Sequence, residues 1–349
     1  MRRPRPNRPR PPAVHPQRHA APLARRRHRR FSCAPTKLHA VASKHATCHN
    51  GAMPAPLGPA DDAVAGPATP SLPDTAHWVA MIRAIESERA DPLFRDPFAR
   101  RLAGAQGRRM LEESAFFAKA EWTFIARTLL FDDIIQREIS LGADAVVSLA
   151  AGLDARAWRM TIPSAVRWFE LDFPEMIAHK QSLMAGEQPA CTLECIGLDL
   201  TDAPARLDAL TRISARCRRA IVIAEGFMAY LEDEQADAIV RDLAGVAPFR
   251  RLAVDLGSPG LLAMLHRKAE PALRSGATRL RFAPPEGPAW FEPRGWTPVQ
   301  VRSFLSASPA RKRFPLILRV LSYLPQPYPR RPSQPWGGVC LFERAASPS

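Results

Sequence analysis

Five short apolar segments, separated by stretches with helical character, constrain the fold of this chain more than any other feature. They cover residues 145–149, 167–172, 192–198, 220–224 and 252–256. Strands that are apolar throughout are typical of a parallel sheet covered by helices on both faces. Four of the five end in an acid or a small residue, and such sheets bind ligands beside the carboxyl ends of their strands. The pattern therefore predicts an α/β fold with a ligand site along that edge.

Helical segments precede this region and a proline-rich segment follows it. Helical spacing of apolar residues begins near Thr75, and further helices are expected at residues 98–102 and 114–141. Residues 257–298 contain seven prolines, which predicts an insertion that could cover the ligand site. A final pair of strands is expected toward residues 339–342. The body of the protein should therefore be one domain, residues 75–345.

The first 60 residues differ in composition from the rest of the chain. They hold 13 Lys or Arg, eleven prolines and no Asp or Glu, whereas the remaining residues hold 36 basic and 34 acidic side chains. The net charge of +15 thus belongs mainly to this segment, and it implies no nucleic-acid partner for the body. Such a composition buries too little apolar surface to fold, so residues 1–74 are expected to be a disordered tail and linker.

Four interpretations of this tail stay open. Its arginines would suit an arm that binds nucleic acid or another acidic surface, or an organelle transit segment. Its six histidines could bind metal weakly. Alternatively, translation starts at Met53 or Met81, and the segment is not part of the working protein. No motif of the body depends on which of these holds.

Cysteine usage and hydropathy exclude several classes of protein. Six cysteines are too few for a disulfide scaffold, and Cys191 and Cys195 lack the additional ligands that a zinc site needs. No apolar run reaches the roughly 18 residues of a membrane-spanning helix. We therefore expect a cytoplasmic protein with reduced thiols, no metal and no membrane partner.

A turn of small residues follows the first strand. Ala150-Ala151-Gly152 leaves the backbone open to a ligand, and Asp172 follows Gly152 by twenty residues, at the end of the next strand. In Rossmann-like sheets, a carboxylate with this spacing binds the ribose hydroxyls of an adenine nucleoside. The pyrophosphate fingerprint G-x-G-x-x-G is absent, which argues against NAD or FAD and favours a ligand such as S-adenosylmethionine. A structural loop with a surface aspartate is the alternative.

Residues 146–159, VVSLAAGLDARAWR, resemble the stretch hhxLGAGLDTRayRL of the leucine carboxyl methyltransferase family. Four further blocks resemble the bacterial branch of that family in the same order, at residues 82–104, 127–133, 169–180 and 225–231. The resemblance implies a Rossmann-like class I methyltransferase fold. Such a fold has a seven-stranded, mostly parallel sheet, here with an N-terminal helical extension and an insertion after strand five. S-adenosylmethionine is the implied cofactor.

The same resemblance implies roles for individual residues around the cofactor. Arg127 would pair with the carboxylate of the methionine moiety, and Glu225 would lie near that moiety. Gly152 would let the cofactor lie against the backbone, and Asp172 would hold the ribose hydroxyls. An ordinary charge on a helix surface is the alternative for Arg127.

Three further residues complete the implied site. Asp199 and Leu200 would flank the adenine, and Tyr230 would lie near the acceptor pocket. The alternatives are a turn cap for Asp199 and a packed core aromatic for Tyr230. The chain departs from the family pattern at Ala150, where glycine is usual, and at Ala155, where threonine is usual. The alanine at 150 is expected to tighten the turn slightly.

The chemistry of the acceptor is indicated by the scarcity of histidine in the body. His77, His179 and His266 are the only three there, and none lies at a strand end of a matched block. Because a carboxylate acceptor needs no general base, this favours O-methylation of a carboxylate or an acidic hydroxyl of a small molecule. The alternatives are another adenine-nucleotide enzyme, such as a dehydrogenase, and a family member that binds the cofactor without turnover.

Overall fold

The computed structural model describes residues 72–113, 115–268 and 279–345. The predicted tail, residues 1–74, lies outside this description except for its last three residues, which begin the first helix. The description below concerns the body alone.

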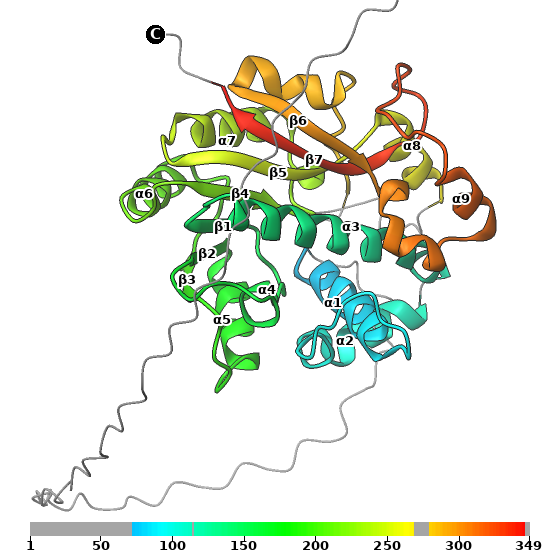
Figure 1. Cartoon of the computed structure of the whole chain (residues 1–349), viewed down its shortest axis with the longest axis horizontal. Helices are drawn as coiled ribbons and strands as arrows, with labels where there is room; N and C mark the ends of the chain where they lie inside the picture. The colour runs from blue at the N-terminus through cyan, green and yellow to red at the C-terminus, as the bar shows by residue number, and fades with distance from the viewer. Residues whose placement is uncertain (1–71, 114, 269–278, 346–349) are drawn as a thin grey trace, which may run out of the picture. The chain divides into compact units, whose positions relative to one another are not determined.

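The core of the body is a seven-stranded sheet with strand order β3-β2-β1-β4-β5-β7-β6 (Figure 1). Strands β1 to β5 pair in parallel, and β7 runs antiparallel to both of its neighbours. The strands are β1 (Ala145–Leu149), β2 (Arg167–Asp172), β3 (Thr192–Gly197), β4 (Ala220–Ala224), β5 (Phe249–Gly257), β6 (Trp296–Ser303) and β7 (Gly337–Arg344). The expected Rossmann-like class I methyltransferase sheet is thereby confirmed, including the final strand pair.

Helices cover both faces of this sheet, as the apolar strands predicted. The α-helices are α1 (Leu72–Glu88), α2 (Ala99–Glu113), α3 (Ala115–Ser140), α4 (Arg156–Arg159), α5 (Pro174–Leu183), α6 (Ala203–Ser214), α7 (Asp233–Gly245), α8 (Pro259–Lys268) and α9 (Leu316–Leu321). Short 3₁₀ helices are η1 (Met228–Tyr230), η4 (Gly287–Arg294), η5 (Phe304–Ser306) and η6 (Ser308–Arg313). None of the helices in these described ranges has the length and hydropathy that a bilayer crossing requires.

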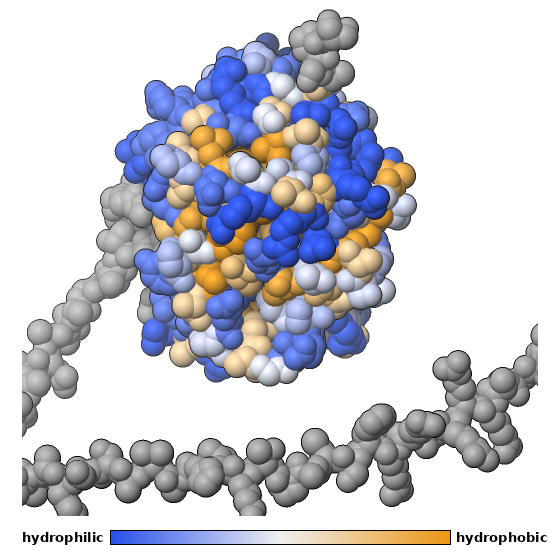
Figure 2. Space-filling view, turned by 90° about the vertical axis from the view of Figure 1, so that its left-hand side faces the viewer, coloured by the Kyte–Doolittle hydropathy of each residue, from blue (hydrophilic) through white to orange (hydrophobic). Residues whose placement is uncertain are grey.

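Side chains of successive strand residues enter two different apolar cores. On β1, Val147 and Leu149 pack with α6 and α7, whereas Val146 packs with α1 and α3 on the other face. All three are buried, because a strand directs alternate side chains to opposite faces. The outer surface beside α6 and α7 carries hydrophobic residues in small groups between hydrophilic ones (Figure 2).

The structure differs from the predicted helices in two places. The short helix expected at residues 98–102 continues to Glu113, past a kink at Gly104, whose φ of 58° is left-handed. The proline-rich insertion also contains regular structure, since α8 begins at Pro259 and η4 contains Pro288 and Pro293. Proline is well tolerated in the first turn of a helix, where its missing N–H has no partner to lose.

Hydrogen bonds join the end of β5 to the segment that precedes β7. The Ser258 N–H donates to the Trp336 carbonyl over 2.9 Å, and its hydroxyl donates to the Gln334 carbonyl over 2.7 Å. The Gly260 N–H donates to the Pro332 carbonyl over 2.8 Å. A Cβ at Gly260 would lie 2.1 Å from the Ser333 carbonyl oxygen, so only glycine fits there. This β5–β7 clasp fixes where the insertion leaves the sheet.

Candidate active site

One cavity of about 1040 Å³ gathers all seven residues that the sequence singled out. They are Arg127, Gly152, Asp172, Asp199, Leu200, Glu225 and Tyr230. Six of them follow the carboxyl ends of β1 to β4, and Arg127 reaches the same place from α3. The cavity therefore lies at the edge of the sheet where α/β folds bind their ligands.

The turn after β1 is held by a carboxylate from the end of β2. Gly152 has a left-handed φ of 49°, and its N–H donates to Asp172 Oδ2 over 2.6 Å. The Phe173 N–H donates to Asp172 Oδ1 over 2.7 Å. Burial raises the pKa of Asp172 above its usual range, although these two N–H groups oppose the rise. The carboxylate retains lone pairs for further donors, such as ribose hydroxyls.

Ala150, in the same turn, has a φ of 48°, and no other non-glycine residue of the described chain has a positive φ. The left-handed region brings Cβ too close to the backbone, at a cost of about 1–2 kcal/mol. The family pattern has glycine at this position, so this chain carries strain in a turn that faces the cavity.

Replacing Ala150 by glycine is expected to raise the free energy of unfolding by about 1 kcal/mol, because glycine adopts this φ without strain. Denaturant unfolding would measure the change. The matched control is Ala238→Gly at an exposed position of α7, which should lower stability by about 1 kcal/mol. Equal losses in the two variants would show that the turn at Ala150 is relaxed.

Arg127 is held between two carboxylates at the floor of the cavity. Its Nε donates to Glu225 Oε1 over 2.9 Å, and one terminal nitrogen donates to Asp255 Oδ2 over 3.1 Å. Burial alone would lower the pKa of Arg127, but Asp255 and Glu225 outweigh burial and keep the pKa above its usual value. Only 11% of the side chain is exposed, so Arg127 is not an ordinary surface charge.

Gly226 allows this arrangement at the end of β4. Its φ is 67°, and a Cβ there would lie 3.2 Å from a guanidinium nitrogen of Arg127. Its N–H donates to Asp255 Oδ1 over 2.7 Å. Burial raises the pKa of Asp255, and the Arg127 charge and this N–H oppose the rise.

Arg156 connects this group to a second set of ion pairs that was not assigned from the sequence. Its side chain is only 3% exposed and binds Glu225 Oε2 over 2.6 Å, Asp154 Oδ2 over 2.9 Å and Asp132 Oδ1 over 2.6 Å. Arg159 also binds Asp132. Arg156 stands within the matched stretch at residues 146–159, so the block itself contained the signal.

These ion pairs form one continuous cluster beneath the cavity, here called the arginine–carboxylate cluster. Its members are Arg127, Arg156, Arg159, Asp132, Asp154, Glu225 and Asp255. Three arginines and four carboxylates leave one formal negative charge. A cationic ligand above the cluster would therefore be electrostatically favoured.

The remaining site residues lie at two other parts of the cavity. Asp199 Oδ1 accepts hydrogen bonds from the Thr201 N–H over 2.8 Å and the Thr201 hydroxyl over 2.7 Å, so it caps the turn while it lines the cavity. Leu200 is buried beside it. Burial raises the pKa of Tyr230, so its phenol stays protonated at neutral pH.

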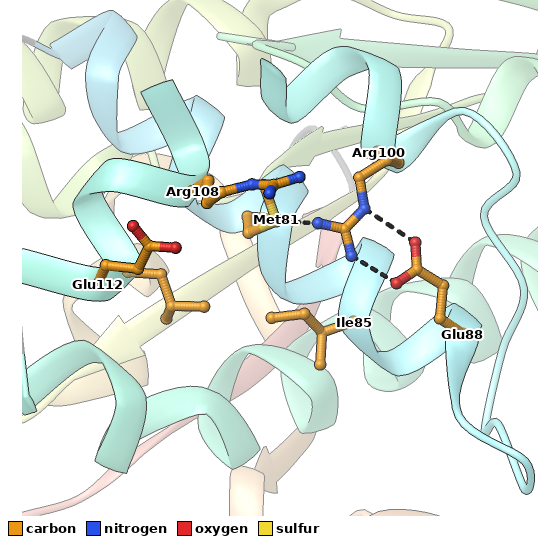
Figure 3. A pocket seen from close by; sticks show the side chains of 7 residues that line it. Met81, Ile85, Glu88, Arg100, Arg108 and Glu112 are labelled. Atoms are coloured by element: carbon orange, nitrogen blue, oxygen red, sulfur yellow. Dashed lines mark hydrogen bonds and ion pairs between the residues drawn. The ribbon is translucent and has the colours of Figure 1, made fainter. Parts of the chain in front are cut away.

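A second, smaller hollow of about 420 Å³ lies between α1 and α2 (Figure 3). Arg100 points to Glu88 across its rim, and the two side chains are joined by hydrogen bonds of 2.8 and 2.5 Å. Arg100 also donates to the Met81 sulfur over 2.9 Å. This hollow contains no strand end and none of the predicted site residues, so the chemistry belongs to the larger cavity.

Within the described ranges, no group of three or more His, Cys, Asp or Glu side chains is arranged to hold a metal ion. Cys191, Cys195, Cys217 and Cys340 are free thiols. Burial raises the pKa of the Cys195 thiol to about 11, so it is not a reactive thiolate at neutral pH.

Comparison with known proteins decides the family. A protein of Frankia alni, named a putative S-adenosyl-L-methionine-dependent methyltransferase, is 33% identical over 262 residues, which is 72% of this chain and 92% of that protein. The model of the leucine carboxyl methyltransferase family matches residues 76–244. The chain belongs to the leucine carboxyl methyltransferase family. It is an S-adenosylmethionine-dependent methyltransferase, which sets aside the dehydrogenase alternative.

Further proteins show similarity to this chain. A protein of Streptomyces coelicolor with the same type of name is 31% identical over 271 residues, 72% of this chain and 90% of that protein. Among solved structures, one of a putative methyltransferase from Thermobifida fusca YX is 14% identical, with a TM-score of 0.47, and covers 80% of this chain and 96% of that one. That likeness is too distant to support an argument, and the strand order itself identifies the fold.

The residues of this leucine carboxyl methyltransferase suit the cofactor. The left-handed turn at Gly152 exposes backbone, and Asp172 at the end of β2 has lone pairs for two hydroxyls. The arginine–carboxylate cluster has an excess negative charge, which suits a sulfonium cation.

Proposed function

We propose that this enzyme methylates an oxygen of a small molecule, either a carboxylate or an acidic hydroxyl. The observation that carries the proposal is the engagement of every carboxylate among the described lining residues. Arginines or backbone N–H groups bind Asp154, Asp172, Glu225 and Asp255, and Thr201 binds Asp199. No carboxylate is left as an obvious general base.

Two other titratable groups of the cavity, His266 and Tyr230, lead to the same conclusion. His266 is the one histidine among the described lining residues, and its Nε2 lies 3.0 Å from the Leu280 carbonyl oxygen. Tyr230 is a neutral phenol, which can donate a hydrogen bond but cannot accept a proton. An acceptor that is already anionic needs no base, whereas a neutral alcohol or amine would need one.

The residue roles that we propose follow the geometry of the cavity. Arg127 uses only two of its five N–H donors on Glu225 and Asp255, so it can also bind the methionine carboxylate. Asp172 would accept from the ribose hydroxyls, and Asp199 and Leu200 would flank the adenine. Tyr230 would donate to the acceptor oxygen and orient it.

The bound cofactor supplies an electrophilic methyl group on a cationic sulfur. Transfer would be an in-line displacement, in which the bond from the acceptor oxygen to the methyl carbon forms as the carbon–sulfur bond breaks and S-adenosylhomocysteine leaves. The chain therefore needs to hold the acceptor oxygen on the side of the methyl carbon opposite the sulfur and to exclude water. The buried arginine–carboxylate cluster provides a fixed electrostatic surface for this purpose, without reorganisation during the reaction.

The test is methyl transfer from S-adenosylmethionine with a labelled methyl group to a panel of carboxylic acids, phenols, alcohols and amines. We expect label in products of the carboxylic acids or the acidic phenols. Treatment with base would release labelled methanol from methyl esters and leave methyl ethers intact. Label found only on nitrogen or carbon would refute oxygen transfer. Cofactor binding without any product would identify a binding protein instead.

A further inference from the structure

We propose that the acceptor is an amphiphile, with its reacting oxygen at the end of an apolar body of lipid size. This deepens the oxygen-directed function proposed above and rests on it. Ligand cavities are typically about 300–1,000 Å³ in volume. The cavity of about 1040 Å³ thus offers space for a second molecule beside the cofactor.

The part of the cavity away from the strand ends is lined by large apolar side chains. They come from three elements: Trp122 and Phe124 on α3, Leu262 and Leu265 on α8, and Leu318 on α9. All five are only half-buried, so part of each apolar surface faces the cavity. An apolar ligand would remove this surface from water, which is the main source of affinity for such a molecule.

The apolar wall begins directly beside the charged part of the site. The guanidinium carbon of Arg127 lies 4.9 Å from the centre of the Phe124 ring. A molecule with its oxygen near Tyr230 would therefore begin its apolar body against Phe124. This order of polar and apolar surfaces matches an acid group at one end of a hydrophobic body.

A second observation concerns the surface around α9, next to the cavity. Leu318 and Pro315 line the cavity, while Leu316, Ile317 and Tyr323 are exposed by 74%, 75% and 70%. Six of the ten exposed large hydrophobic residues of the described chain lie in residues 316–324. Contiguous exposed apolar surface of this kind marks a binding site more often than chance. Helix α9 lies at the right-hand edge of the body in Figure 1, and the distal part of the acceptor would leave the cavity over it.

The charge of the α9 region does not oppose the entry of an anionic acceptor. Residues 304–342 contain six Lys or Arg and no Asp or Glu. Lys312 and Arg313 are paired with Asp91, and Arg319 binds backbone carbonyls of the neighbouring 3₁₀ helix. No acidic side chain of this segment would repel an incoming carboxylate.

The test measures binding of hexanoate, decanoate and tetradecanoate to the full chain saturated with S-adenosylhomocysteine, by calorimetry below the micellar concentrations. Affinity is expected to rise roughly tenfold for each two methylenes until the cavity is filled. Leu318→Asp on α9 and Leu265→Asp on α8 both change residues that line the cavity, and each should weaken decanoate binding by about tenfold or more. S-adenosylhomocysteine affinity should not change, which would also show that both variants fold.

The matched control is Leu207→Asp on α6, where the side chain is 47% exposed and outside the cavity. It should bind decanoate as the unaltered chain does. Affinity that is independent of chain length, or unchanged in both cavity variants, would overturn the proposal. Decanoate that binds as expected but is never methylated would refute a carboxylate acceptor and leave the apolar site intact. Equal methylation of short and long acids would support a carboxylate acceptor and refute the apolar site.

Discussion

Replacing Arg156 by methionine is expected to lower the free energy of unfolding by about 3–5 kcal/mol. The guanidinium binds three carboxylates, Asp132, Asp154 and Glu225, at 2.6 to 2.9 Å. Methionine preserves much of the volume but removes the positive charge, so buried carboxylates would lose their counter-ion. Denaturant unfolding at neutral pH would measure the loss.

The control for this variant is Arg212→Met on α6. Arg212 forms a comparable ion pair with Asp208 over 3.1 Å, but both side chains are more than 60% exposed, at 62% and 68%. Its removal should change stability by less than about 1 kcal/mol. A similarly small effect at Arg156 would mean that water or local rearrangement compensates for the lost charge.

Replacing Asp172 by alanine is expected to weaken binding of S-adenosylhomocysteine by about 100-fold. Hydrogen bonds to a charged group contribute about 1.5–3 kcal/mol each, and the ribose would lose two of them. The Gly152 and Phe173 N–H groups would also lose their acceptor, which loosens the turn beneath the cofactor. Calorimetric titration would give the affinity.

Asp202→Ala separates loss of binding from loss of stability. Asp202 caps α6 by accepting from the Ala205 N–H over 3.2 Å, and it does not line the cavity. Its removal should cost about 1 kcal/mol of stability and leave the affinity for S-adenosylhomocysteine unchanged. If Asp172→Ala also bound S-adenosylhomocysteine normally, the assignment of the ribose site would be wrong.

The fold could be predicted from sequence because its signals are local. Each strand of the parallel region is a short apolar run, and four of the five strands were predicted to within one residue at either end. The exception is β5, which begins at Phe249 because Phe249 and Arg251 pair with Ala220 and Ile221 of β4, despite the charge of Arg251. The helices α8 and η4 were missed because prolines obscure helical spacing.

The site could be predicted only in part, because its contacts join distant parts of the chain. Arg127 and Asp255 are 128 residues apart, and no periodicity links them. Asp255 carried one signal that could have been used, since it lies near the carboxyl end of a strand beside β4. The partners of Arg127 depend on the strand order, which local patterns do not specify.

The β5–β7 clasp has a consequence for the evolution of such enzymes. Ser258 and Gly260 bind Pro332, Gln334 and Trp336 through backbone and hydroxyl groups. Two of the stretches that line the apolar part of the cavity, residues 261–268 and 304–318, lie in the chain between these anchor points. Evolution can therefore exchange these stretches and so change the acceptor. The β5–β7 clasp and the cofactor-binding residues at the strand ends are then inherited unchanged.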